Sequence, residues 1–145
     1  MSNILSESST RIKTGIILII AMLILGYLDS YFLFWLVFGI MLMISISESK
    51  KLFGLKSDSI YIYTSLLWFA AYFYPMPIDL IFIVAIGYAS RLAYKKTLNQ
   101  KLFLPLLYPT ASFLFLLTLY SEFGVMTLLW LLVIVASTDI GAYFV

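Results

Sequence analysis

The sequence predicts an all-α, polytopic integral membrane protein with about six transmembrane helices. Hydrophobic residues make up 63% of the 145-residue chain and charged residues only 11%, whereas soluble domains carry roughly 25% charged residues. The apolar residues form six runs separated by short polar segments. The basic residues fall in alternate segments, as the positive-inside rule requires of a protein with that many spans.

The first two expected spans are residues 15–28 and 31–46, joined by a short turn at Asp29 and Ser30. A basic segment precedes the first run, as in a signal peptide, but no A-x-A-like cleavage site follows the run. We therefore expect an uncleaved first span. The second run is nearly as long as the ~20 residues that cross a bilayer as a helix.

The middle spans are expected at residues 60–74 and 80–90, after a polar loop. Both runs are shorter than the ~20 residues of a comfortable span. Pro75 and Pro77 separate them, and prolines favour a turn because they lack the N–H that a helix needs. Arg91 can lengthen the fourth span because its long side chain reaches toward the membrane surface.

The last two spans are expected at residues 102–120 and 125–145. Pro105 lies in the first turn of the fifth span, where a helix tolerates proline. Pro109 should kink or break the helix, because it cannot donate to the carbonyl of Pro105. Residues 121–124 are expected to form the turn into the sixth span, and the polar loop after the second span is expected at 49–59.

Charge placement supports six spans independently of hydropathy. With a cytoplasmic N-terminus, the outer turns hold Asp29, Asp79 and Glu122. The cytoplasmic segments then hold every basic residue: Arg11, Lys13, Lys50, Lys51, Lys56, Arg91, Lys95, Lys96 and Lys101. Cytoplasmic loops are enriched in Lys and Arg. We expect a multi-pass protein of the cell inner (cytoplasmic) membrane, with residues 1–145 forming a single transmembrane domain.

The residue types present limit the chemistry. The chain has no Cys and no His, which excludes a disulfide framework, a thiolate nucleophile and an imidazole base. No basic patch remains once the loop charges are assigned to the membrane surface, so nucleic acid is not an expected partner.

The strongest candidate for a functional residue is Asp139, which follows an apolar run in the sixth span. A carboxylate at membrane depth costs at least ~2.5 kcal/mol, so it normally faces protein or a water-filled cavity. Asp139 lies ~21 Å past the outer end of its span, in the cytoplasmic leaflet. Tyr143 shares its helix face, and Ser137 is a polar neighbour. The alternative is that Asp139 caps a helix or reaches an interface, while Tyr143 and Ser137 only anchor or pack.

Glu48, at the end of the second span, is expected in the same leaflet as Asp139. Two converging carboxylates could share Mg²⁺, which prefers oxygen ligands. The alternative for Glu48 is a solvated residue paired with Lys50 or Lys51. For the whole chain, an intramembrane Asp also suits a small transporter or channel subunit that binds a proton or cation. A non-catalytic membrane scaffold is a third hypothesis.

The segment STDIGAYFV (137–145) resembles the sDtGAYf segment of the bacterial phosphatidate cytidylyltransferase family, also called CDP-diacylglycerol synthases. The opening RIKTGIIL resembles that family's basic entry into its first span, and Glu48 resembles its Glu at the end of the second. Gly124 with the later TLLWLLVIV is similar to the approach to the Asp. The resemblance covers the chain loosely and residues 124–145 closely. The family's later Gly-Arg, S-P-x-K-T-like loop and C-terminal signature are missing, so we expect a truncated N-terminal portion.

This resemblance implies that the full-length protein is a nucleotidyltransferase of phospholipid synthesis. It would transfer CMP from CTP to phosphatidate with Mg²⁺, forming CDP-diacylglycerol and pyrophosphate, and the truncated chain alone would be inactive. The resemblance implies a catalytic and metal-positioning role for Asp139, a lesser metal role for Glu48, and substrate contacts for Tyr143 and Ser137. CTP, phosphatidate and membrane lipids are the expected partners, and a homo-oligomer is left open.

Overall fold

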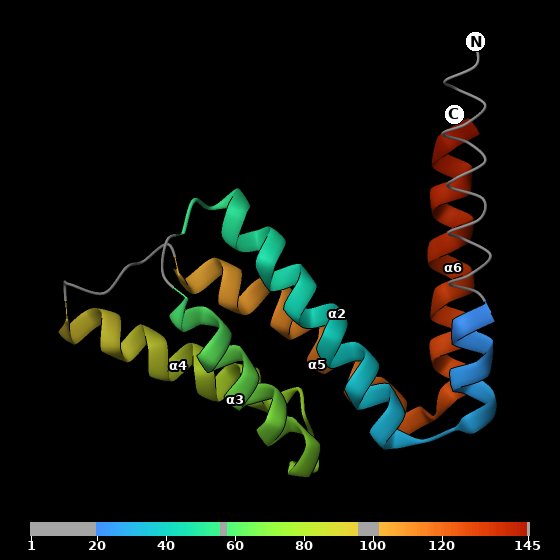
Figure 1. The fold of residues 1–145 in the computed structure, drawn as a ribbon, viewed down its shortest axis with the longest axis horizontal. Helices are drawn as coiled ribbons and strands as arrows, with labels where there is room; N and C mark the ends of the chain where they lie inside the picture. Colours follow the sequence, from blue (N-terminus) through green and yellow to red (C-terminus); the bar gives the residue numbers. More distant parts are fainter. Residues whose placement is uncertain (1–19, 56–57, 96–101, 145) are drawn as a thin grey trace. The chain divides into compact units, whose positions relative to one another are not determined.

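The computed structural model describes residues 20–55, 58–95 and 102–144, and these residues are all-helical, as the sequence predicts (Figure 1). A helical segment at 20–28 is followed by five helices: α2 (Tyr31–Leu52), α3 (Ser59–Phe73), α4 (Asp79–Tyr94), α5 (Phe103–Phe123) and α6 (Val125–Phe144). Each described helix corresponds to one of the six apolar runs.

α2 is longer than the sequence indicates. It continues to Leu52, so the polar loop does not begin at residue 49 as expected. Lys50 and Lys51 lie in its last turn, where cations interact favourably with the partial negative charge of a helix C-terminus. Lys50 also forms an ion pair with Asp58, just before α3.

α5 runs through Pro109 without a break. Of the two outcomes expected there, a break is therefore wrong and a kink stays a prediction. Packing compensates for the lost backbone hydrogen bond, because α5 contacts α2, α3 and α4 and Pro109 itself is buried. The turn expected at 121–124 is also shorter than predicted. The helix continues to Phe123, and Gly124 alone turns the chain with φ 75°, a left-handed value that glycine adopts without strain.

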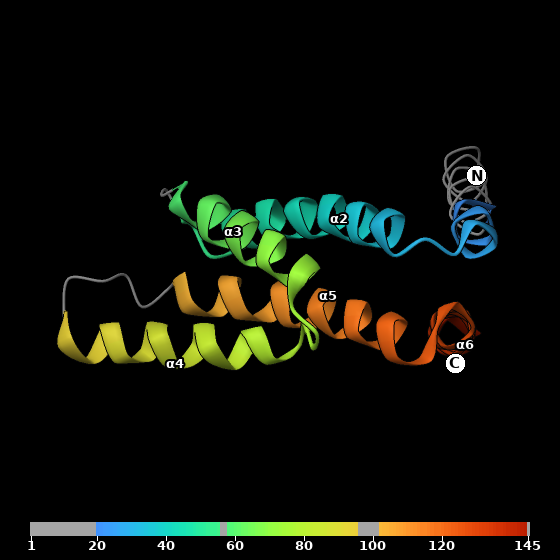
Figure 2. The ribbon, with the colours of Figure 1, turned by 90° about the horizontal axis from the view of Figure 1, so that it is seen from below.

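The described chain falls into two compact units, and the larger comprises residues 31–124. In this unit α2 and α3 form one layer and α4 and α5 the other (Figure 2). One stripe of α2 is fully or almost fully buried, because its members are spaced four residues apart and share a helix face: Phe34, Phe38, Leu42 and Ile46. Aromatic rings join this stripe to α5, with the ring centroids of Phe34 and Tyr120 4.2 Å apart.

The larger unit has one basic end and one acidic end. α2 and α4 finish, and α3 and α5 begin, at the basic end, on the left in Figure 1. This end carries every Lys and Arg that the structure describes: Lys50, Lys51, Arg91 and Lys95. Asp79 and Glu122 lie at the opposite, acidic end.

Two helical stretches in the described residues are long and apolar enough to cross a membrane, judged by length and composition alone. They are Tyr31–Leu52, with 22 residues and a mean hydropathy of 1.9, and Leu106–Phe123, with 18 residues and a mean hydropathy of 1.2. Ser59–Phe73 and Val125–Asp139 are shorter apolar helices.

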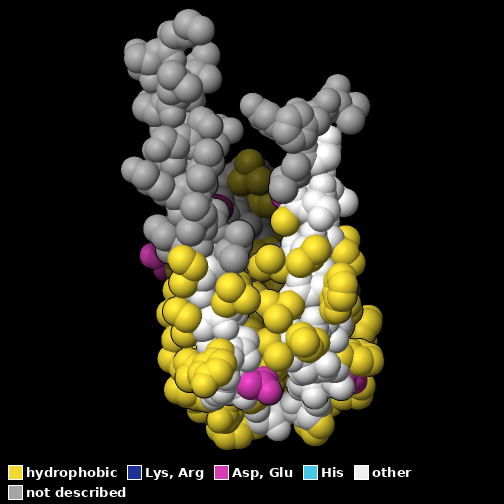
Figure 3. Space-filling model, turned by 90° about the vertical axis from the view of Figure 1, so that its right-hand side faces the viewer, with side chains coloured by type: hydrophobic (Ala, Val, Ile, Leu, Met, Phe, Trp, Pro, Cys, Tyr) yellow, Lys and Arg dark blue, Asp and Glu magenta, His cyan; other side chains and the backbone are white. Residues whose placement is uncertain are grey.

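The smaller unit contains the segment 20–30 and α6. The helical segment 20–28 lies beside the first turns of α6, and Gly26 allows this approach. A Cβ atom on Gly26 would lie 3.2 Å from Cγ2 of Val125 and 3.9 Å from Cδ1 of Leu129. Hydrophobic side chains cover most of the described surface of this unit in the face that Figure 3 shows.

Candidate functional site

α6 carries the polar triplet Ser137, Thr138 and Asp139 within an otherwise apolar helix. The helix continues through the triplet to Phe144, so Asp139 does not cap a helix N-terminus. Asp139 lies fourteen residues after Val125 (139 − 125 = 14), which places it ~21 Å along the helix axis.

The two hydroxyl groups of the triplet bond to their own helix. The Ser137 hydroxyl donates to the carbonyl oxygen of Val133 at 2.7 Å, and the Thr138 hydroxyl donates to that of Val135 at 2.7 Å. A hydroxyl has one hydrogen and two lone pairs. Ser137 can therefore accept a hydrogen bond from a ligand, but it must first release Val133 before it can donate one.

The described side chains in the second half of α6 are exposed. All residues from Val133 to Asp139 are exposed, and at about 100° per residue they cover the whole helix circumference. No ion pair joins Asp139 to another described residue. A polar triplet of this kind is satisfied by water or by further protein rather than by lipid.

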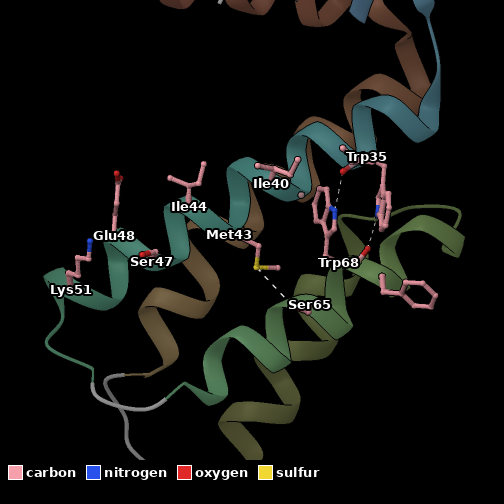
Figure 4. A pocket seen from close by; sticks show the side chains of 12 residues that line it. Trp35, Ile40, Met43, Ile44, Ser47, Glu48, Lys51, Ser65 and Trp68 are labelled. Atoms are coloured by element: carbon pink, nitrogen blue, oxygen red, sulfur yellow. Dashed lines mark hydrogen bonds between the residues drawn. The ribbon is translucent and has the colours of Figure 1, made fainter. Parts of the chain in front are cut away.

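Glu48 lies on α2, at the polar end of a groove of about 710 Å³ between α2 and α3 (Figure 4). Ser47, Glu48 and Lys51 form this polar end. The rest of the groove is mostly apolar and is lined by Trp35, Leu36, Gly39, Ile40, Met43, Ile44, Ser65, Trp68 and Phe69. The groove is thus apolar along most of its length, and one end carries both a positive and a negative side chain.

Lys50 is not the partner of Glu48. It pairs with Asp58, and its ammonium group lies 5.3 Å from the ring centroid of Tyr61. Within the described part of the chain, Glu48 and Lys51 form no ion pair with each other or with another residue. The exposed Glu48 carboxylate is therefore available to a ligand.

Sequence reasoning did not identify the apolar end of this groove. There the indole N–H of Trp35 donates to the carbonyl oxygen of Trp68 at 2.9 Å, and that of Trp68 donates to the carbonyl oxygen of Trp35 at 3.1 Å. The two tryptophans thus join α2 to α3. The one signal that the sequence offered was Gly39, a glycine inside an apolar run. In the structure, a Cβ atom there would lie only 2.4 Å from Nε1 of Trp68.

The structure groups some of the expected site residues and not others. Ser137 and Asp139 share α6, as does the backbone of Tyr143, whose side chain lies outside the described residues. Glu48 belongs to the other unit, so its convergence with Asp139 stays a prediction. In the described part of the chain, no three acidic side chains group closely enough to hold a metal ion together.

The similarity to known proteins extends over nearly the whole chain and is not limited to the triplet. The model of the cytidylyltransferase family matches residues 9–145. The chain belongs to this family. The match includes both units, and it confirms the resemblance that the segment STDIGAYFV indicates.

Two curated proteins, both named phosphatidate cytidylyltransferase, are similar to the chain. The protein from Helicobacter pylori strain 26695 is 39% identical and that from strain J99 is 37% identical, each over 145 residues and 99% of this chain. The chain spans about half of their length, 54% in both cases. No solved structure matches the chain.

Proposed function

We propose that the full-length protein is a phosphatidate cytidylyltransferase of phospholipid synthesis. The match to the cytidylyltransferase family over residues 9–145, together with two relatives of that name, carries the proposal. In this reaction a phosphate oxygen of phosphatidate attacks the α-phosphorus of CTP. The bond from this phosphorus to the α–β bridging oxygen breaks, pyrophosphate leaves with the electron pair, and CDP-diacylglycerol forms.

The protein would act as a multi-pass protein of the inner membrane, with six spans and a cytoplasmic N-terminus. The separation of basic and acidic ends in the larger unit supports this orientation, since cytoplasmic loops are rich in Lys and Arg. Phosphatidate is held by the bilayer and CTP is soluble, so the two meet at the membrane surface. A basic cytoplasmic end would attract both anionic substrates.

Asp139 and Glu48 would hold Mg²⁺ and position the phosphates. Both are exposed carboxylates without an ion pair to a described residue, and carboxylate oxygens are ligands that Mg²⁺ prefers. When bound, Mg²⁺ would neutralise charge that develops on the phosphate oxygens.

Each carboxylate lies well along its own helix. Glu48 lies seventeen residues after the start of α2 (48 − 31 = 17), or ~26 Å, against ~21 Å for Asp139 along α6. Ser137 would accept a hydrogen bond from the nucleotide or from bound water, and Tyr143, one turn after Asp139, would contact substrate.

The test is turnover of CTP and phosphatidate by the purified full-length protein, followed as lipid-bound cytidylate. We expect Asp139→Asn to lower kcat by about 100-fold or more, the size of effect seen when a preorganised electrostatic group is removed. Asp79→Asn, which changes a carboxylate at the acidic end, should leave kcat within about two-fold, as for a residue that makes no transition-state contact.

Absence of turnover in folded wild-type protein would contradict the proposed reaction. Full activity of Asp139→Asn would instead leave the reaction in place and remove Asp139 from it.

A further inference from the structure

A second groove of about 640 Å³ lies among α3, α4 and α5, at the basic end of the larger unit. It is formed by the first half of α3, the start of α5 and the part of α4 from Ile83 to Arg91. Its lining residues are Ser59, Ile60, Tyr63, Leu66, Leu67, Ile83, Val84, Gly87, Tyr88, Arg91, Leu102 and Leu106. None of them belongs to the groove beside Glu48 or to the triplet of α6.

The interior of this groove suits a hydrocarbon chain. Its floor is buried, with Ile60, Leu67 and Leu106 at most 8% exposed. Its walls remain open to the surroundings, because Leu66 and Ile83 are 65% and 57% exposed. Leu67 lies eight residues after Ser59 (67 − 59 = 8), or ~12 Å along the helix, close to the ~15 Å depth of one leaflet of the hydrocarbon core.

The mouth of the groove suits an anion. Arg91 is the one charged residue among the described residues that line it, and no carboxylate faces it there. Arg91 forms no ion pair with a described residue. Tyr88, one turn before Arg91 on the same face of α4, is held by stacking on Phe103, with ring centroids 5.6 Å apart.

We propose that this groove binds an anionic phospholipid, with the phosphate at Arg91 and an acyl chain along the apolar interior. A guanidinium group binds phosphate through two parallel hydrogen bonds. A choline headgroup adds a positive charge that has no carboxylate partner among the lining residues, so the groove should discriminate against phosphatidylcholine. The proposal does not rest on the cytidylyltransferase reaction, because lipid binding is measured without CTP.

Gly87 provides a way to block the groove without disturbing the fold. A Cβ atom on Gly87 would meet no other atom within 4 Å, so a larger side chain enters the groove rather than a neighbouring helix. Lys95 provides the matched charge control, since it lies at the same end of the unit and is exposed, but does not line the groove.

The experiment titrates the full-length protein in detergent with phosphatidylglycerol and phosphatidylcholine and measures bound lipid by native mass spectrometry. We expect wild-type protein to bind phosphatidylglycerol about ten-fold more tightly than phosphatidylcholine, as charge-assisted phosphate bonds imply. Arg91→Gln should remove most of this preference, and Arg91→Lys should restore part of it. Gly87→Leu should weaken the binding of both lipids. Lys95→Gln should change the affinity for phosphatidylglycerol less than about two-fold, as a screened surface charge does.

Three results would overturn the proposal, provided that the variants remain monodisperse. The first is equal binding of the two lipids by wild-type protein. The second is an equal loss of phosphatidylglycerol affinity in Arg91→Gln and Lys95→Gln, which would indicate that the lipid is attracted to the basic end in general. The third is displacement of the lipid by glycerol phosphate at equal concentration, which would mean that the apolar interior contributes nothing.

Discussion

Trp35 and Trp68 exchange hydrogen bonds, each indole N–H donating to the backbone carbonyl oxygen of the other residue, at 2.9 Å and 3.1 Å. This reciprocal pair joins α2 to α3 in the larger unit. It satisfies both indole donors without any other polar side chain, since a carbonyl oxygen has two lone pairs and can accept a second bond. Gly39 lies one turn after Trp35 and leaves room for the Trp68 ring.

Gly39→Ala should destabilise the protein by about 1–3 kcal/mol, the usual cost of overpacking. The new methyl group would lie 2.4 Å from Nε1 of Trp68, so the ring must move and the geometry of the reciprocal bonds must change. Denaturant unfolding in detergent measures the change. Gly87→Ala is the matched control, since nothing lies within 4 Å of its Cβ position, and it should be neutral or stabilising by up to about 1 kcal/mol. Equal stabilities of the two variants would contradict the packing at Gly39.

Trp68→Phe should cost about 0.5–1.5 kcal/mol for the lost hydrogen bond, in addition to the smaller ring's lost packing. The Trp68 side chain is 4% exposed, whereas Trp130 is 66% exposed. Trp130→Phe should therefore change stability by less than about 0.5 kcal/mol. Thermal unfolding of both variants in the same detergent measures the two changes. A larger loss of stability for Trp130→Phe than for Trp68→Phe would contradict the difference in burial.

Thr118→Val should destabilise the turn between α3 and α4. The backbone N–H of Ile78 donates to the Thr118 hydroxyl at 3.0 Å, and Thr118 is only 7% exposed. Valine keeps the shape but leaves this donor unsatisfied, at a cost of about 1–3 kcal/mol. Thr118→Ser should recover most of the loss, because it restores the acceptor. Unchanged stability of Thr118→Val would mean that this hydrogen bond does not stabilise the turn.

Removal of divalent metal by EDTA should abolish the proposed transfer reaction, and added Mg²⁺ should restore it. Glu48→Gln should raise the Mg²⁺ concentration needed for half-maximal rate by about ten-fold or more, as loss of a metal-site group does. Glu122→Gln, which alters an exposed carboxylate at the acidic end, should leave that concentration unchanged. A Mg²⁺ requirement that is equal in wild-type and Glu48→Gln protein would remove Glu48 from the metal site.

The apolar runs were enough to locate every described helix, because a run of apolar residues of this length has few stable alternatives to a helix. They also indicated the alternation of basic and acidic ends, which follows from the order of charged segments along the chain. The segment around Asp139 indicated the family directly, and the match over residues 9–145 confirms it. The apolar runs did not locate the helix ends, because α2 and α5 both continue past the last residue of their apolar runs.

The contacts between helices could not be obtained in this way. No local pattern pairs Gly39 with Trp68, or Ile78 with Thr118, because these residues lie far apart in sequence and meet only when α2, α3 and α5 pack. The groove at Arg91 likewise requires parts of α3, α4 and α5 to lie side by side. Hydropathy depends on each residue's own side chain and its neighbours along the chain, whereas grooves and buried hydrogen bonds depend on complementary shapes from distant segments.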